Sequence, residues 1–506
     1  MLTPRVVTVV SLLLAVLPST AFALDVASFV SQTVPTYLNP GASTTVTVTM
    51  KNIGTTTWSN AGGYKLGAQN PQDNTTWMGD TRVYLSPSEM ILPNAQKTFT
   101  FTITAPATPG FYNFQWRMVR EGVTWFGEYT QNVSLQVGGC RGADPRDTTA
   151  DDTAINQCLA GGGIVSLIPG SPGYYIQDTI LVGPGVTHFT STKRTPGTEA
   201  KLIATASNAP MGNSSPLVEV TGSNLLIDYL IVDGNKNARS GLCSGLRYSA
   251  SNIYVSGSNV TIDRIQSNNT YCGSALVVSG RNLEIADSEF YSNGFPAGTS
   301  GRGDAPWSDG ITATLCIASI HDNVIIDFSD VGLVVGGGGP QAGTCVVERN
   351  WLEQHHGRAF AGIGVSNFAV DGQGNYGPGS RIADNYVNGG PSGLIDLGMV
   401  AGTHPWDASL DTHGATITGN TMENNKINLL VDGYSSGSIY DNCLSAPIGG
   451  LSDCNTPIGP ANLVIAHATG ACVQQSGAIR RYVHYYNSGS CLTDTSTPSV
   501  CANCTP

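Results

Sequence analysis

The sequence has few charged residues and almost none of the patterns typical of long helices. Only 12% of its 506 residues are charged, and 36 Asp and Glu outnumber 24 Lys and Arg, which leaves a formal net charge of −12. Nucleic-acid binding relies on Lys and Arg that neutralise phosphates, so this balance argues against a nucleic-acid partner. The negative net charge also disfavours binding of a polyanionic substrate, unless a local basic patch exists. Amphipathic runs of Ala, Leu, Glu and Lys are nearly absent, and 61 Gly with many Asn, Ser and Thr favour β structure.

Beyond the N-terminus, no apolar stretch is long enough to be a transmembrane helix. The N-terminus itself carries Arg5, an apolar run over residues 6–17 and the small-x-small pattern Ala21-Phe22-Ala23. This combination is typical of a secretory signal peptide. We therefore expect residues 1–23 to be removed, and the mature chain to be a secreted, extracellular monomer without a membrane span.

The 12 cysteines are even in number and show no zinc-finger spacing, so disulfides are the favoured interpretation in an oxidising compartment. Sequence cannot prove the connectivity. Pairing in sequential order would join Cys140–Cys158, Cys243–Cys272, Cys316–Cys345, Cys443–Cys454, Cys472–Cys491 and Cys501–Cys504. The last pair is a C-x-x-C in a disulfide-containing tail over 491–506, where no βαβ pattern supports a redox role.

Residues 24–138 show alternating runs separated by Asn, Gly and Pro turn signals, which predicts one immunoglobulin-like β-sandwich. Four tryptophans lie in it: Trp58, Trp77, Trp116 and Trp125. This layout resembles the four-tryptophan domain of selective-autophagy receptors, relatives of which are attached to secreted bacterial enzymes. We favour core and rim packing for these rings. The alternative is an aromatic platform that docks a glycan or a protein.

Residues 139–490 open with Asp151-Asp152-Thr153-Ala154-Ile155-Asn156, followed by Gly161-Gly162-Gly163-Ile164-Val165. This opening resembles that of pectate-lyase-like, right-handed parallel β-helices. The resemblance implies a short helix that caps the first coil. The chain as a whole is thus predicted to be all-β, a sandwich followed by a β-helix.

An internal repeat supports this prediction. The motif Ile-x-x-Asn, with Val in place of Ile in one copy, recurs five times, and the copies end at Asn323, Asn350, Asn385, Asn420 and Asn442. A second motif, a small residue followed by apolar residues, alternates with it, as at Gly310-Ile311 and Gly332-Leu333. Two strands per coil at this period indicate a solenoid, in which stacked coils bury what one coil cannot. We assign the recurrent Asn to a structural amide ladder.

Polar residues interrupt the repeat at one turn position on three consecutive coils. Asp309 comes first, Asp327 and Asp330 follow on the next coil, and His355, His356 and Arg358 on the third. Two stacked carboxylates repel, so one pKa rises and the other falls, as a general acid and base require. Asp309 and Asp330 in direct stacking at ~5 Å would suit a retaining glycosidase, whereas Asp309 and Asp327 at ~7–9 Å would suit an inverting one. The alternative for a single Asp at a tight turn is capping of local amides.

An insertion over residues 294–307 directly precedes Asp309. It includes Asp304 and ends at Trp307. We predict that it walls a substrate groove, with Trp307 stacking on a sugar ring and Asp304 as a further substrate contact.

The same order of residues resembles the polygalacturonase family of glycoside hydrolases. Ser308-Asp309-Gly310 matches its Asn-Thr-Asp motif in part, Asp327 to Asp330 stands for its paired Asp, and His356-Gly357 for its Gly-His-Gly. Arg381-Ile382-Ala383 keeps the Arg-Ile of its Arg-Ile-Lys but lacks the Lys, which weakens any inference of a galacturonate substrate.

Three functions remain open from the sequence. A glycoside hydrolase would use Asp309 and Asp330 as acid and base, with Asp327 assisting and His356 and Arg358 orienting the substrate, and would need no cofactor. A polysaccharide lyase would use Asp309, Asp327 and Asp330 as calcium ligands, with Arg358 or His356 as the base. A non-catalytic carbohydrate-binding or adhesin solenoid is the third. We favour the hydrolase because Lys is scarce across the predicted helix.

Overall fold

The computed structural model describes residues 23–205, 215–238, 251–270, 273–294, 308–337, 343–366, 375–407 and 409–449, and short segments from 451 to 492. The chain divides into two compact units, Met1–Gly138 and Gly139–Pro506. The described residues include no helix long and apolar enough to cross a membrane.

The first unit is a sandwich of two sheets. One has the order β1-β3-β8, the other β2-β11-β9-β5-β6 with β10 beside β9, and β4 pairs with β7. The strands are β1 (Ala27–Thr33), β2 (Tyr37–Leu38), β3 (Ser43–Asn52), β4 (Trp58–Ser59), β5 (Tyr64–Gln69), β6 (Arg82–Tyr84), β7 (Met90–Ile91), β8 (Gln96–Thr104), β9 (Gly110–Arg120), β10 (Thr124–Tyr129) and β11 (Val133–Val137). In β8, Phe99, Phe101 and Ile103 alternate with exposed Thr, the period of two that a half-buried strand requires.

The tryptophans of this unit are largely part of its core. Trp58, Trp77 and Trp116 are at most 4% exposed. Trp125 lies on the outside of the second sheet, against Gly67 and under the guanidinium of Arg82, 4.8 Å from the ring centroid. A side chain at position 67 would collide with this ring. The likeness to the four-tryptophan domain stays a prediction.

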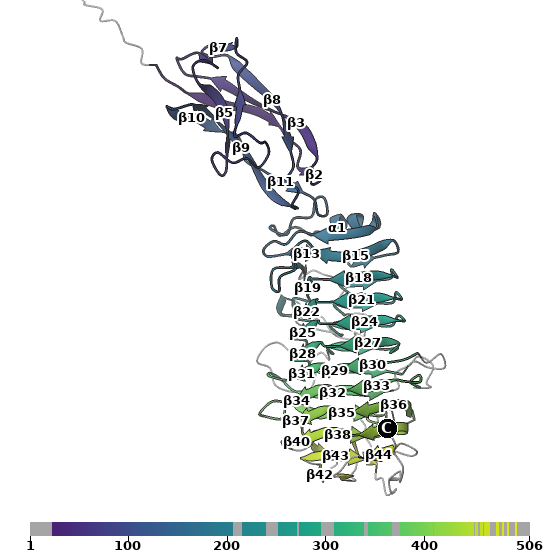
Figure 1. Cartoon of the computed structure of the whole chain (residues 1–506). Coiled ribbons are helices and arrows are strands. Elements are labelled where there is room, and N and C mark those ends of the chain that lie inside the picture. The colour runs from purple at the N-terminus through teal and green to yellow at the C-terminus, as the bar shows by residue number, and fades with distance from the viewer. Residues whose placement is uncertain are drawn as a thin grey trace, which may run out of the picture. The chain divides into compact units, whose positions relative to one another are not determined.

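The second unit is a parallel β-helix of three sheets, whose coils stack one upon the next (Figure 1). Sheet I contains β12 (Gly163–Leu167), β15 (Val186–Ser191), β18 (Leu225–Asp228), β21 (Val260–Asp263), β24 (Leu283–Ala286), β27 (Ala318–His321), β30 (Val346–Glu348), β33 (Arg381–Ala383), β36 (Thr412–Thr418), β39 (Tyr434–Tyr440) and β44 (Cys472–Gln474). Sheet II contains β13 (Tyr174–Ile176), β16 (Ala200–Ala204), β19 (Leu230–Asp233), β22 (Gln266–Asn268), β25 (Glu289–Tyr291), β28 (Val324–Ile326), β31 (Trp351–Glu353), β34 (Tyr386–Asn388), β37 (Thr421–Glu423) and β40 (Cys443–Ser445). Sheet III contains β14 (Ile180–Val182), β17 (Val218–Val220), β20 (Ile253–Val255), β23 (Leu276–Val278), β26 (Ile311–Ala313), β29 (Val331–Gly336), β32 (Ala359–Ser366), β35 (Ile395–Ala401), β38 (Ile427–Val431), β43 (Ala461–Ile465) and β45 (Ala478–Ile479).

A few elements lie outside these sheets. They are the 3-10 helix η1 (Lys236–Ala238) and the two-stranded pairs β41 (Leu451–Asp453) with β42 (Thr456–Ile458) and β46 (Val483–His484) with β47 (Cys491–Leu492). The predicted fold, a sandwich followed by a right-handed parallel β-helix, is confirmed.

Each coil has three strands, so the prediction of two was wrong. The first repeat motif covers the end of a sheet I strand, a sharp turn and the start of a sheet II strand. At this turn, which we name the I–II corner, one residue takes a positive φ, such as Asp322 at 57°, Arg349 at 54° or Asp384 at 56°. The Asn of the motif follows immediately. The chain changes direction from sheet I to sheet II within only two residues, which is why the sequence on both sides of the corner resembles one continuous strand.

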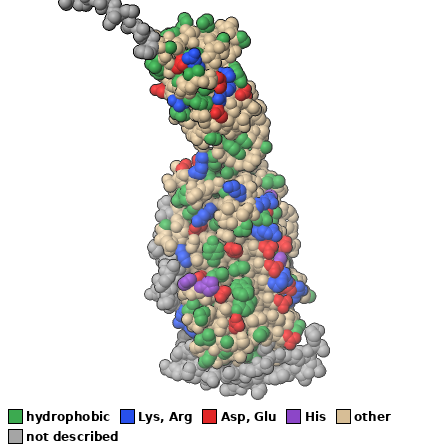
Figure 2. Space-filling model, turned by 60° about the vertical axis from the view of Figure 1, so that its left-hand side comes forward, with side chains coloured by type: hydrophobic (Ala, Val, Ile, Leu, Met, Phe, Trp, Pro, Cys, Tyr) green, Lys and Arg blue, Asp and Glu red, His purple; other side chains and the backbone are tan. Residues whose placement is uncertain are grey.

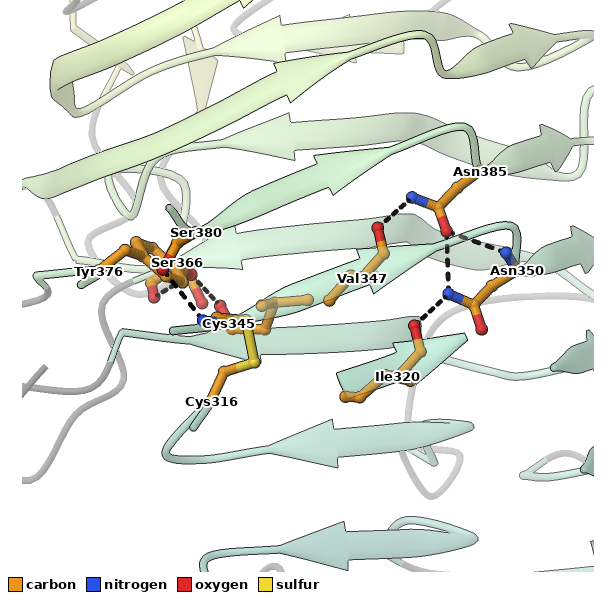
Figure 3. The surroundings of a disulfide bond; sticks show 10 residues. Cys316, Ile320, Cys345, Val347, Asn350, Ser366, Tyr376, Ser380 and Asn385 are labelled. Carbon is orange, nitrogen blue, oxygen red and sulfur yellow. Dashed lines mark hydrogen bonds between the residues drawn. A yellow bond between two sulfur atoms is a disulfide. The ribbon is translucent and has the colours of Figure 1, made fainter. Parts of the chain in front are cut away.

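The predicted amide ladder is present at the I–II corner. Each Asn from Asn323 to Asn420 donates from Nδ2 to Oδ1 of the next Asn at 2.9 Å, and the last acceptor is Asn442. Nδ2 also donates to a main-chain carbonyl of the preceding coil, as from Asn385 to Val347 (Figure 3). The ladder therefore satisfies buried polar groups and ties each coil to the next.

The short helix implied by the resemblance is also present. Helix α1 (Asp152–Ala160) buries Ile155 and Leu159 at the top of the β-helix core. A disulfide joins Cys158 of this helix to Cys140, as predicted.

A second predicted disulfide, Cys316–Cys345, links successive coils (Figure 3). Cys443 is an exposed free thiol, so the predicted Cys443–Cys454 bridge is wrong. The remaining predicted pairs involve residues or side chains outside the described part of the chain.

Candidate functional site

The residues selected from the sequence lie at the turn from sheet II to sheet III, which we name the II–III corner. Asp309 lies two residues before β26, Asp327 and Asp330 lie between β28 and β29, and His355 to Arg358 lie between β31 and β32. These are three successive coils, because β26, β29 and β32 are neighbours in sheet III. Asp304 and Trp307 fall outside the described residues.

Glycine makes this corner tight. A Cβ at Gly310 would lie 2.5 Å from both the carbonyl oxygen of Gly332 and the side chain of Ile325, and a Cβ at Gly332 would lie 2.6 Å from the side chain of Leu352. Such distances are far below van der Waals contact. The small residue of the second motif is thus the point where sheet III closes against sheet II, and the polar residues immediately before it lie at the edge of the corner.

Asp309 is buried, and its carboxylate is hydrogen-bonded at both oxygens. Oδ1 accepts the main-chain N–H of Val331 at 3.1 Å, and Oδ2 accepts the hydroxyls of Thr312 at 2.6 Å and Ser274 at 3.3 Å. Burial raises the pKa of Asp309, and the three hydrogen bonds oppose this effect. Asp309 therefore joins three coils through its carboxylate.

Asp330 is held by its main chain to both neighbouring coils. Its N–H donates to Ser308 at 3.2 Å, and its carbonyl oxygen accepts the N–H of Phe360 at 2.8 Å and of Ala361 at 3.1 Å. The side chain is half-buried. Asp309 aligns with Val331, one residue from Asp330, as the sequence spacing predicts.

Asp327 orients a histidine. It has a φ of 57°, and its Oδ1 accepts the N–H groups of His355 at 2.7 Å and His356 at 2.8 Å. Its Oδ2 lies 2.9 Å from Nδ1 of His356, whose side chain is 74% exposed. With the proton of a neutral imidazole on Nδ1, the lone pair of Nε2 is directed away from Asp327. Asp327 thus fixes the orientation of an exposed imidazole.

Lys236 is a cation near Asp327 that sequence reasoning missed. It is buried, and its Nζ donates to the carbonyl oxygen of Ser292 at 2.5 Å. Burial lowers the pKa of Lys236, while the charges of Asp327 and Asp233 raise it. The only sequence signal is a Lys in a region where Lys is scarce.

Arg358 is paired with a buried acid that was also missed. Its Nη2 donates to Asp396 at 2.8 Å and 3.1 Å, and Nζ of Lys426 donates to Oδ1 of the same carboxylate at 2.6 Å. The side chain of Asp396 is 3% exposed and that of Arg358 is 39% exposed. Asp396 could have been found as the one charge in the otherwise apolar strand β35.

The three aspartates do not converge on a common point for a metal. Within the described ranges, no group of three or more His, Cys, Asp or Glu side chains is placed to hold a metal ion. Asp309 and Asp327 instead bind separate sets of main-chain N–H groups. The arrangement thus offers a protonatable acid and an oriented imidazole at one corner.

Comparison with known proteins gives only distant similarities. No protein-family model and no curated protein matches the chain. Among solved structures, the Dettilon tailspike protein is 15% identical over 67% of this chain and 64% of its own, with a TM-score of 0.42. The A-module of a mannuronan C-5 epimerase from Azotobacter vinelandii is 15% identical over 68% of this chain and 91% of its own, with a TM-score of 0.40. An alginate lyase from Paenibacillus is 14% identical over 65% and 97%, with a TM-score of 0.40.

The chain thus spans less than two thirds of the tailspike protein.

Proposed function

We propose that this protein is a carbohydrate-active enzyme, a glycoside hydrolase that cleaves an extracellular polysaccharide at the II–III corner. The observation that carries the proposal is the pair of Asp327 and His356. A carboxylate from one coil fixes the imidazole of the next and leaves its outer nitrogen exposed. A purely structural turn needs only the two main-chain hydrogen bonds that Asp327 also accepts.

The proposed chemistry divides the roles among three coils. The bond between the anomeric carbon and the leaving oxygen breaks, a general acid protonates that oxygen, and water supplies the hydroxyl that replaces it on the sugar while a general base takes the proton of the water. Asp309 and Asp330 share the acid and base roles. Burial raises the pKa of Asp309, so we assign it to proton donation and Asp330 to the base. His356 and Arg358 orient the sugar.

Two further parts of the proposal concern the whole chain. Removal of residues 1–23 on export would place the enzyme outside the cell, and the two disulfides suit an oxidising compartment. We expect a monomer whose sandwich domain acts as a spacer or docks a glycan or protein. Mass spectrometry of the exported chain tests the cleavage after Ala23.

The test is a screen of the purified chain on plant, algal and microbial polysaccharides, with Asp330→Asn beside wild type. We expect new reducing ends with wild type and at least a 100-fold lower rate with Asp330→Asn, since general acid–base catalysis contributes about 10² to 10⁴. Asp384→Asn is the matched control, because Asp384 is an aspartate of the I–II corner on the same β-helix.

Two outcomes would refute the hydrolase. One is a folded wild-type protein that releases no product from any polysaccharide, which favours a non-catalytic binding solenoid. The other is a product with unsaturated, ultraviolet-absorbing ends that depends on calcium, which identifies a lyase.

A further inference from the structure

A pair of aromatic rings, one exposed and one half-buried, lies on the outer face of sheet II. Trp351 of β31 is 45% exposed, and its ring stacks on Tyr386 of β34 with centroids 4.1 Å apart and planes inclined by 33°. The two residues are direct register partners on adjacent coils. Their neighbours in the same row are the smaller Val324 and Thr421. The rings therefore form a raised step on a strand surface.

Hydrogen bonds fix the orientation of both rings. The indole Nε1–H donates to Glu353 at 3.1 Å, and the Tyr386 hydroxyl donates to Glu423 and accepts from Asn388 at 3.1 Å. Burial and the bond to Glu423 raise the pKa of Tyr386 to about 12, so this hydroxyl stays protonated. Coverage of the strand does not explain an exposed Trp at this position. An aliphatic side chain would cover the strand equally well and would leave less apolar area exposed to water.

The step is continuous with the II–III corner. Glu353, which holds the indole, lies 3.4 Å from Nε2 of His355, and His355 is adjacent in sequence to His356. Figure 2 shows hydrophobic, acidic and histidine side chains together on the face turned forward. A ligand lying on the two rings can thus extend to the proposed catalytic residues.

The charges around the step indicate the class of ligand. Glu353 and Glu423 flank it, and these carboxylates are strong acceptors for sugar hydroxyls. A uronate or sulfated chain would bring like charge against them, which costs affinity. Aromatic faces in turn bind the apolar C–H faces of pyranose rings.

We propose that Trp351 and Tyr386 form a binding platform for an uncharged polysaccharide chain, which continues into the II–III corner. The platform deepens the proposed function, because it names neutral glycans as the substrate class. It nevertheless depends on binding alone and can be tested separately from cleavage.

The test is affinity gel electrophoresis of the full chain in gels that contain galactomannan, arabinoxylan, mixed-linkage β-glucan, dextran, alginate or polygalacturonate. At least one neutral glycan should retard wild type, and Trp351→Ala should weaken that binding by about tenfold or more, as truncation of an aromatic contact does. Trp351→Phe should restore most of the affinity. Leu181→Ala is the control, because Leu181 is an exposed apolar residue on sheet III.

Tryptophan fluorescence gives a second measurement. Binding should change the emission of wild type, and Trp351→Phe should bind without that change. The platform is refuted if no neutral glycan retards wild type, if Trp351→Ala binds as wild type does, or if a uronate polymer binds tightest.

These outcomes separate the platform from the hydrolase. Cleavage with binding that Trp351→Ala leaves unchanged refutes the platform alone. Binding through Trp351 without any release of product refutes the hydrolase alone.

Discussion

Replacing Asn385 by Ala should reveal how much the amide ladder stabilises the β-helix. Asn385 is 1% exposed. Its Oδ1 accepts the N–H of Asn350 at 3.0 Å and the Nδ2–H of Asn350 at 2.9 Å. Its Nδ2 donates to Asn420 at 2.9 Å and to Val347 at 3.0 Å. Removal of the side chain thus affects the coils on both sides.

The expected decrease in the free energy of unfolding follows from the hydrogen-bonding groups that the substitution leaves without partners. The acceptors lose little, because Oδ1 of Asn420 still accepts the main-chain N–H of residue 385 at 3.0 Å. The N–H of Asn350 and one of its two Nδ2–H atoms lose their acceptor in a buried site. At about 1–3 kcal/mol for each unsatisfied donor, the free energy of unfolding should fall by about 2–6 kcal/mol.

Asn259→Gly is the matched control. Asn259 belongs to an exposed ladder, in which it donates to Asn224 at 2.9 Å and accepts from Asn282 at 3.2 Å. Glycine suits its φ of 55°, and water can replace the lost bonds, so we expect a change below about 1 kcal/mol.

Urea unfolding followed by circular dichroism measures both free energies, and hydrogen exchange at the Asn350 amide reports the local effect. A loss below about 1 kcal/mol for Asn385→Ala, or equal losses in both variants, would refute the argument that burial gives the ladder its strength.

Three other predictions concern the tautomer of His356, the buried carboxyl group of Asp151 and the disulfide between Cys316 and Cys345. Asp327→Asn should keep the two main-chain bonds but turn an amide N–H toward Nδ1 of His356, which moves the ring proton to Nε2. ¹⁵N NMR should report this tautomer, and the rate should fall by about 10² because His356 no longer presents the same nitrogen to the sugar. A wild-type tautomer in the variant would contradict the assignment. Burial raises the pKa of Asp151 to about 7, against about 4 unfolded, so its contribution to stability is complete below pH 4 and is lost as pH rises through 7. That loss is on the order of 4 kcal/mol. In Asp151→Asn the urea midpoint of unfolding should therefore depend less on pH between pH 4 and 7 than it does in wild type; the same pH dependence in both proteins would contradict this prediction. Cys316→Ser with Cys345→Ser opens a bridge of sequence separation 29 and should lower stability by about 3–4 kcal/mol, while a melting temperature equal to that of wild type would contradict this.

The sequence was sufficient to predict the fold because its main signals are local and repeated. Inward apolar residues identify the solenoid, and the recurrent Asn from Asn323 to Asn442 identifies the ladder. The third strand was missed because the turn between sheets I and II carries no Gly or Pro at most coils. Arg349 adopts a positive φ, and no propensity rule assigns Arg to that conformation.

The candidate site was predictable only in its position. Spacing along the repeat was enough to align Asp309, Asp327 and His356 at one corner. Their partners depend on which residues of neighbouring coils face them, and loops of different length separate these coils. The contacts of Asp309 with Ser274 and Thr312, and the approach of Lys236 toward Asp327, therefore required coordinates.

The I–II corner also determines where this chain tolerates changes in length. Successive ladder asparagines are separated by 27, 35, 35 and 22 residues, yet each of them directly follows one residue of positive φ. All variation in length lies elsewhere in the coil. The I–II corner thus keeps a constant geometry, while the connections between sheets III and I, which vary most in length along these coils, can be exchanged or grafted without shifting the register of the sheets. Recognition of new ligands could be engineered, or evolve, by such exchange while the stack of coils keeps its pitch.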